Sequence, residues 1–181
     1  MNAEPADTTL EAATSKPAFR MLSGKEVVEK IPRTMQISFR LFTVDDLPEF
    51  RAWFADAELS RRLSFPTDEW FAYVTAGGAA RSWVALDADR MIAQVQVDRE
   101  DAERGYLDLA MRPHLRGRGL GAAVLAAFLS GPGRAYPILE GRIEPDNAAS
   151  LACCRRCGFV ILPEPDADGF MQAVYRSSQT S

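Results

Sequence analysis

Apolar residues in this chain follow two spacings, one typical of β-strands and the other of α-helices. Residues 37–41 alternate between apolar and polar side chains, whereas Leu47, Phe50 and Phe54 recur at intervals of three and four. These spacings predict strands at 37–41, 82–86, 91–97, 106–111, 138–143, 159–162 and 170–175, and helices at 43–54, 67–74, 120–130 and 147–157. The order predicts a mixed α/β (α+β) fold, a single domain in which helices flank a mostly antiparallel sheet.

Residues 1–36 are expected to form an N-terminal extension to a folded domain at 37–181. The segment as far as Lys16 is rich in Ala, Thr, Pro and acidic residues and shows no amphipathic period. The Ser-Gly-Lys-Glu sequence at 23–26 fits a helix capping box, and Pro32 ends the segment that follows it. A short docked helix and a disordered linker both fit this part of the chain.

Composition and charge narrow the classes of function. The chain is 47% apolar and 25% charged, as in ordinary soluble globular proteins. Its net charge of −4 does not indicate nucleic-acid binding. No basic region followed by an apolar run opens the sequence, and the longest nearly apolar stretch, 120–129, is too short to span a bilayer. We therefore expect neither a secretory signal nor membrane association.

Three cysteines, Cys153, Cys154 and Cys157, fall within one predicted helical turn. Such crowding does not suit a disulfide framework, so we expect a cytoplasmic protein. Cys153 and Cys157 are spaced i and i+4, but a structural zinc site normally needs four ligands. The single histidine, His114, is distant in sequence, so no metal site is predicted.

A basic glycine-rich sequence, Arg-Gly-Arg-Gly-Leu-Gly at 116–121, separates a predicted strand from a predicted helix. Glycines let the backbone approach an anion closely, and the first amides of a helix point outward without partners. The helix dipole and the two arginines add positive potential. The sequence therefore predicts a phosphate-binding loop, with a solvated flexible loop as the alternative.

The spacing Gly117-x-Gly119-x-x-Ala122 also fits a dinucleotide-binding fingerprint, with Glu140 near the position of the ribose-binding carboxylate. Two observations count against this interpretation. Residues 113–116 intervene between the strand and the first glycine, where that fold requires a tight turn. The chain after Ala122 is also too short for the rest of a doubly wound sheet.

A second motif lies at 147–159, where Asn147 begins a predicted helix and Gly-Phe follows its end. Read with the first motif, it resembles the GNAT superfamily of acyl-CoA-dependent N-acyltransferases. The family loop is Arg or Gln, two residues, Gly, one residue, then Gly or Ala, which Arg116, Gly119 and Gly121 match. Its later motif is an Asn, a small residue three positions on, here Ser150, and Gly-Phe at the helix end. The resemblance spans roughly 37–176, and the opening is similar to the branch that acetylates ribosomal-protein N-termini and antibiotics.

The resemblance implies a GNAT-like domain with acetyl-CoA as cosubstrate. In the family, loop amides hold the pyrophosphate, and main-chain groups at the end of the fourth strand pair with the pantetheine arm. The residues implied in binding acetyl-CoA are Leu109, Ala110, Met111, Arg116, Gly117, Arg118, Gly119, Leu120, Gly121, Ala122 and Asn147.

The resemblance also implies direct transfer of an acetyl group to an amine. The family often places a tyrosine, as general acid, seven residues after the Asn, but this chain has Cys154 there. Ser150, one helical turn earlier on the same face, is the alternative donor. Asp108 and Glu140 are the candidate bases, since Arg142 stands where some members carry a glutamate.

Two functions remain open from the sequence. The first is an N-acetyltransferase acting on a small amine or a peptide N-terminus. The second is a catalytically degenerate domain that binds acyl-CoA as a sensor or interaction module, which the missing tyrosine suggests. The acceptor stays unidentified, and a homodimer is left open.

Overall fold

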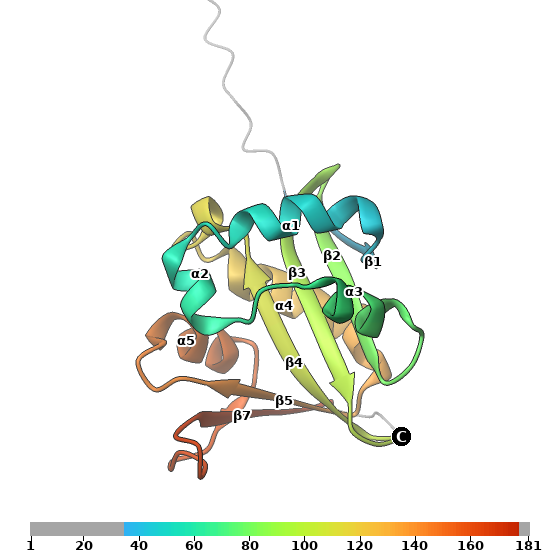
Figure 1. Cartoon of the computed structure of the whole chain (residues 1–181). Helices are drawn as coiled ribbons and strands as arrows, with labels where there is room; N and C mark the ends of the chain where they lie inside the picture. Colours follow the sequence, from blue (N-terminus) through green and yellow to red (C-terminus); the bar gives the residue numbers. More distant parts are fainter. Residues whose placement is uncertain (1–34, 178–181) are drawn as a thin grey trace, which may run out of the picture. The chain divides into compact units, whose positions relative to one another are not determined.

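A computed structural model describes residues 35–177, in which seven strands form one sheet (Figure 1). The strands are β1 (Ile37–Leu41), β2 (Ala80–Asp87), β3 (Arg90–Arg99), β4 (Arg104–Met111), β5 (Ile138–Ile143), β6 (Val160–Ile161) and β7 (Met171–Arg176). The α-helices are α1 (Leu47–Trp53), α2 (Ala57–Arg62), α3 (Asp68–Thr75), α4 (Leu120–Ser130) and α5 (Ala148–Arg156), with 3-10 turns η1 (Val44–Asp46), η2 (Pro113–Leu115) and η3 (Pro132–Ala135). The capping-box sequence at 23–26 lies outside the described residues.

The sheet is mixed and mostly antiparallel, as predicted. Its strand order is β1-β2-β3-β4-β5-β7-β6, and within residues 35–177 only β4 and β5 pair in parallel. Their pairing ends at Tyr106 opposite Glu140, after three residue pairs. Beyond this point the two strands diverge, and the gap between them widens toward the end of β4 (Figure 1).

The two faces of the sheet carry separate hydrophobic clusters. Alternate residues of β3 and β4, such as Val95 and Leu107, point to the face covered by α4, where they pack with Phe128. Ala110 points to the other face and packs with the cluster that includes Phe50 of α1. Figure 1 shows α1 and α3 on one side of the sheet and α4 on the other. Side chains of β4 therefore alternate between two chemically distinct sides of the strand.

The predicted helix at 43–54 is divided in the structure. Asp46 accepts hydrogen bonds from the Thr43 amide and hydroxyl at 2.8 and 2.9 Å, which favours a separate 3-10 turn before α1. Arg40 also binds the Asp46 carboxylate through both of its terminal nitrogens, so the turn is anchored to β1. The spacing of apolar residues therefore identified the helical region but not that its first turn is a 3-10 turn.

Helix α2 was not predicted. Asp56 caps it by accepting a hydrogen bond from the Leu59 amide, but the helix is six residues long and buries only Leu59. A single buried apolar residue cannot establish a helical period. This omission matters because α2 lies beside the gap between β4 and β5.

Candidate active site

The glycine-rich loop has the geometry expected of an anion cradle. Gly117 and Gly119 adopt φ angles of +74° and +75°, in the left-handed region that favours glycine. No heavy atom lies within 4 Å of a Cβ built at either position, so the space beside the backbone is open. Gly119 is the N-cap of α4, and no side chain caps this helix. The first amides of α4 are therefore directed at a space that an anionic group can enter.

Arg116 makes a contact that the sequence did not predict. Its guanidinium binds the carboxylate of Asp56, the residue that caps α2. This guanidinium lowers the pKa of the Asp56 carboxyl, and the pair ties the glycine-rich loop to α2. Arg118, by contrast, is exposed. The structure thus brings one of the two loop arginines to an internal partner and leaves the other facing solvent.

A cavity of about 470 Å³ lies at the divergence of β4 and β5. Its wall combines residues from both faces of the sheet: Leu107 and Leu109 belong to the α4 side, whereas Asp108 belongs to the α1 side. The start of α4, most of the length of α5, one face of α2 and the end of β5 also contribute to the wall. The cavity therefore passes through the sheet, from the glycine-rich loop on one face to α2 on the other.

Most of the residues implied in donor binding lie on this cavity. Those that line it are Leu109, Met111, Arg116, Gly117, Gly119, Gly121, Ala122 and Asn147, while Ala110, Arg118 and Leu120 do not. Within residues 35–177, no strand pairs with β4 on the β5 side after Tyr106, so main-chain groups on that edge are available to a ligand. Asn147 already caps α5, since its side-chain oxygen accepts a hydrogen bond from the Ser150 amide at 3.2 Å.

The four candidate catalytic residues separate into two groups. Asp108, Ser150 and Cys154 line the cavity, whereas Glu140 lines a neighbouring one and pairs with Arg104, whose Nε lies 3.4 Å from the carboxylate. The structure therefore brings three of the four candidates together.

The Asp108 carboxyl has an unusual environment. The side chain is exposed to the cavity, yet protein surrounds it at longer range, and this burial raises the pKa of the Asp108 carboxyl. The negative charge of Asp98 on β3 adds to the increase in pKa. A carboxylate of raised basicity in a cavity is suited to accept a proton.

Sequence reasoning missed the polar groups around Asp108. Gln96 is paired with Asp108 across the β3–β4 ladder. The Gln96 amide donates to Asp98 at 2.7 Å and accepts from the Trp70 indole N–H at 2.8 Å. The signal was the alternation of polar Gln94, Gln96 and Asp98 within an otherwise apolar strand, which places polar side chains on the α3 side.

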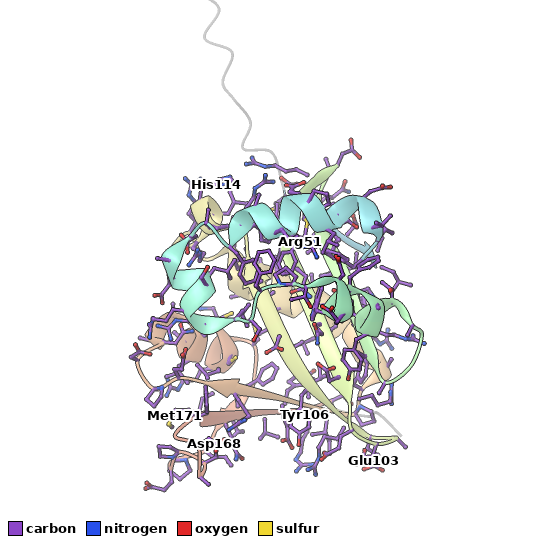
Figure 2. All side chains as sticks on the ribbon, in the orientation of Figure 1. Arg51, Glu103, Tyr106, His114, Asp168 and Met171 are labelled. Atoms are coloured by element: carbon purple, nitrogen blue, oxygen red, sulfur yellow. The ribbon has the colours of Figure 1, made fainter. Side chains whose placement is uncertain are left out.

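The cysteines are weakly acidic thiols. Burial raises the pKa of Cys154 to about 12 and that of Cys153 to about 11. No group of His, Cys, Asp or Glu between residues 35 and 177 is arranged to hold a metal ion. His114 is exposed and lies at the opposite end of the sheet from Tyr106 and Asp168 (Figure 2).

Residues 36–160 match the family model of the acetyltransferase (GNAT) domain. The chain belongs to this family of N-acetyltransferases. It is similar to the uncharacterized N-acetyltransferase YfmK of Bacillus subtilis (strain 168), with 29% identity over 143 residues, covering 77% of this chain and 96% of YfmK.

Solved GNAT structures share the fold. One is the aminoglycoside acetyltransferase AAC(6')-Ib in complex with coenzyme A and kanamycin, at a TM-score of 0.65 and 18% identity, covering 78% of this chain and 95% of that one. Another is the ribosomal alpha-N-protein acetyltransferase RimL in complex with coenzyme A, at a TM-score of 0.66 and 17% identity, covering 81% and 97%. No helix among the described residues is long and apolar enough to cross a membrane.

Proposed function

We propose that this chain transfers an acetyl group from acetyl-CoA to a primary amine, with both substrates bound at once. The observation that carries the proposal is the cavity that passes through the sheet where β4 and β5 diverge. A thioester that enters from the glycine-rich loop and an amine that enters from the α2 side meet inside it. Holding the two reactants together in this way removes much of the entropic barrier to a bimolecular reaction.

The residues of the donor side fit acetyl-CoA. The loop at 117–119 and the first amides of α4 hold the pyrophosphate, while the free edge of β4 at 109–111 pairs with the amide groups of the pantetheine arm. Gly121 lies close to Met111 and Cys153, since a Cβ built there approaches both side chains at 3.7 Å. A larger residue at this position narrows the cavity.

Asp108 is assigned as the general base. In the reaction, the amine nitrogen bonds to the acetyl carbon, the carbon–sulfur bond breaks, and the proton lost from nitrogen passes to the Asp108 carboxylate. Asp108 lies on the acceptor side of the cavity, and burial and Asp98 raise the pKa of its carboxyl. Glu140 is the weaker candidate, because it lies in the neighbouring cavity beside Arg104.

Ser150 is assigned as the proton donor to the departing thiolate. Its hydroxyl and the Cys154 thiol both belong to the α5 wall of the cavity. Cys154 has a pKa of about 12, well above the value of about 8.5 for an ordinary thiol, so proton transfer from it to a thiolate is uphill. We therefore assign Cys154, whose side chain is buried, to packing. A hydroxyl is a weaker acid still, so Ser150 is assigned as a relay: it passes its proton to the departing sulfur and in the same step takes one from solvent through a water molecule.

The acceptor is a small molecule or a peptide N-terminus that presents one primary amine. Steady-state assays with acetyl-CoA and a panel of such amines test the proposal. Direct transfer predicts an acetylated amine as product and initial-velocity lines that intersect when both substrates are varied. Parallel lines contradict a ternary complex. Tight binding of CoA with no turnover on any amine contradicts the enzymatic proposal and favours the sensor or interaction module.

A further inference from the structure

A second cavity of about 440 Å³ adjoins the first on the acceptor side. Gly141 and Arg142 of β5 line both cavities, so they form the wall between them. Because Tyr106 and Glu140 are paired in parallel register, their side chains lie on the same face, and Asp108 and Arg142 follow two residues later on that face. Asp108 and Arg142 therefore occupy opposite edges of the opening through the sheet.

The Arg142 side chain is held by the connection between β6 and β7. Its Nε donates to the Asp166 carboxylate at 2.7 Å and its Nη2 donates to the Asp168 carboxylate at 2.6 Å. The guanidinium carbon also lies 4.6 Å from the centroid of the Phe170 ring, a cation–π distance. Figure 2 shows Asp168 and Tyr106 at the same end of the sheet. These contacts fix the guanidinium at the boundary of the two cavities, with its charge balanced by the two carboxylates.

The Asp166 carboxylate does not depend on Arg142 for its position. It also accepts hydrogen bonds from the main-chain amides of Asp168 and Phe170, at 3.0 and 2.9 Å. The Asp166 carboxylate consequently stays near the boundary when the guanidinium is removed, and it leaves an anionic site that one organic cation can occupy. The Asp168 side chain is 72% exposed and lies beside it.

We infer that Arg142 determines acceptor specificity, because its guanidinium occupies the place that a second ammonium group of an acceptor would otherwise take. The inference rests on the proposed function, since it concerns the acceptor side of the same cavity. It assigns the acceptor to amines with one positive charge near the reaction centre. Diamines and polyamines that extend past Asp108 find the Asp166 and Asp168 carboxylates already paired with the guanidinium, which disfavours their binding.

Two amines of equal length measure the discrimination against a second ammonium group. Hexylamine and 1,6-diaminohexane differ only at the far end, where the diamine carries that group. The ratio of kcat/KM for the diamine to kcat/KM for the monoamine is measured for the full-length protein and for Arg142→Ala. We expect the ratio to rise at least tenfold in the variant. Arg142→Gln, which keeps a polar side chain without charge, gives a rise in the same direction, and Arg142→Lys, which keeps the charge, gives the smallest.

Arg134→Ala is the matched control, because Arg134 is an exposed arginine that lines neither cavity. It leaves the ratio unchanged. A ratio that stays within twofold of the wild-type value in both Arg142→Ala and Arg142→Gln overturns the inference, as does an equal loss for both amines.

Binding of the same two amines to the CoA-saturated protein, measured by calorimetry, separates this inference from the proposed function. If no amine is acetylated, the acyltransferase proposal fails, and the calorimetric ratio still decides the role of Arg142. Tighter binding of the diamine to Arg142→Ala than to the wild type supports the inference. Equal binding, or no binding of either amine to either protein, contradicts it.

Discussion

The two sides of the cavity are built in different ways. On the donor side, consecutive residues of the β4 edge and the loop at 116–122 present mainly main-chain groups. On the acceptor side, side chains from α2, β4, β5 and the β6–β7 connection meet across long stretches of sequence. Main-chain recognition of this kind tolerates side-chain changes as long as the glycines remain, whereas the acceptor side changes its chemistry with each substitution. One fold can therefore keep a donor while its acceptors diverge.

The largest expected effect comes from the donor side. Gly119→Asp places a carboxylate at the first amides of α4, where we expect the pyrophosphate to lie, and should weaken acetyl-CoA binding at least hundredfold. Gly77→Asp is the matched control, since Gly77 also has a positive φ, of +73°, and open space beside it, but lies outside the cavity. Calorimetric titration with CoA compares the two. Equal affinities in the two folded variants would show that the loop is not the pyrophosphate site.

Asp108→Asn is expected to have the next largest effect, and on turnover alone. Removing a general base typically lowers the rate by about 10²–10⁴-fold. The variant should keep its affinity for acetyl-CoA, because Asp108 points to the acceptor side. Steady-state kinetics with a saturating amine measure the loss. A change in kcat below about threefold would remove Asp108 from the mechanism.

Asp108→Asn should also raise the stability of the protein at neutral pH but not at low pH. Burial and Asp98 raise the pKa of the folded Asp108 carboxyl, so the folded state binds this proton more tightly than the unfolded state. The carboxylate thus lowers stability at pH values above its raised pKa, and Asp108→Asn should melt at a higher temperature than the wild type at neutral pH. This difference should disappear below about pH 4, where the carboxyl is protonated in both states. Thermal melts across this range provide the test.

A smaller effect is expected from the ion pairs that join α2 to the segment between β5 and α5. The Arg62 side chain is 13% exposed and binds the carboxylates of Glu58, Glu144 and Asp146. Arg62→Ala leaves these carboxylates without that partner, so we expect a fall in melting temperature of about 3 °C and a higher KM for the amine. Arg61→Ala is the control, since Arg61 is 49% exposed and should change neither quantity. Equal effects of the two substitutions would contradict a special role for Arg62.

The difference between the donor side and the acceptor side of the cavity also explains which features the sequence predicted. The glycine-rich loop, the end of β4 and the cap at Asn147 are local motifs, and each lies where its spacing placed it. The positions of the strands along the chain were also predictable, because apolar residues in several of them follow a period of two. These features depend on neighbours in sequence, which a single sequence records.

The remainder depends on residues that meet only in the folded chain. The pairs of Arg116 with Asp56 and of Arg62 with Glu144 join segments about 60 and 80 residues apart, and no periodicity signals them. Arg142 appeared only as a departure from the family pattern, because its role depends on Asp166 and Asp168 in a connection without regular structure. The shape of the acceptor side was therefore beyond the reach of local patterns.

Hydrogen–deuterium exchange with and without saturating CoA tests the central claim most directly. If main-chain groups hold the donor, amides within 109–111 and 117–122 should exchange at least tenfold more slowly in the complex, while those of the β6–β7 connection should not change. Protection confined to the β6–β7 connection, or an unchanged rate at 117–122 under saturation, would contradict the assignment of the donor to the glycine-rich loop and the free edge of β4.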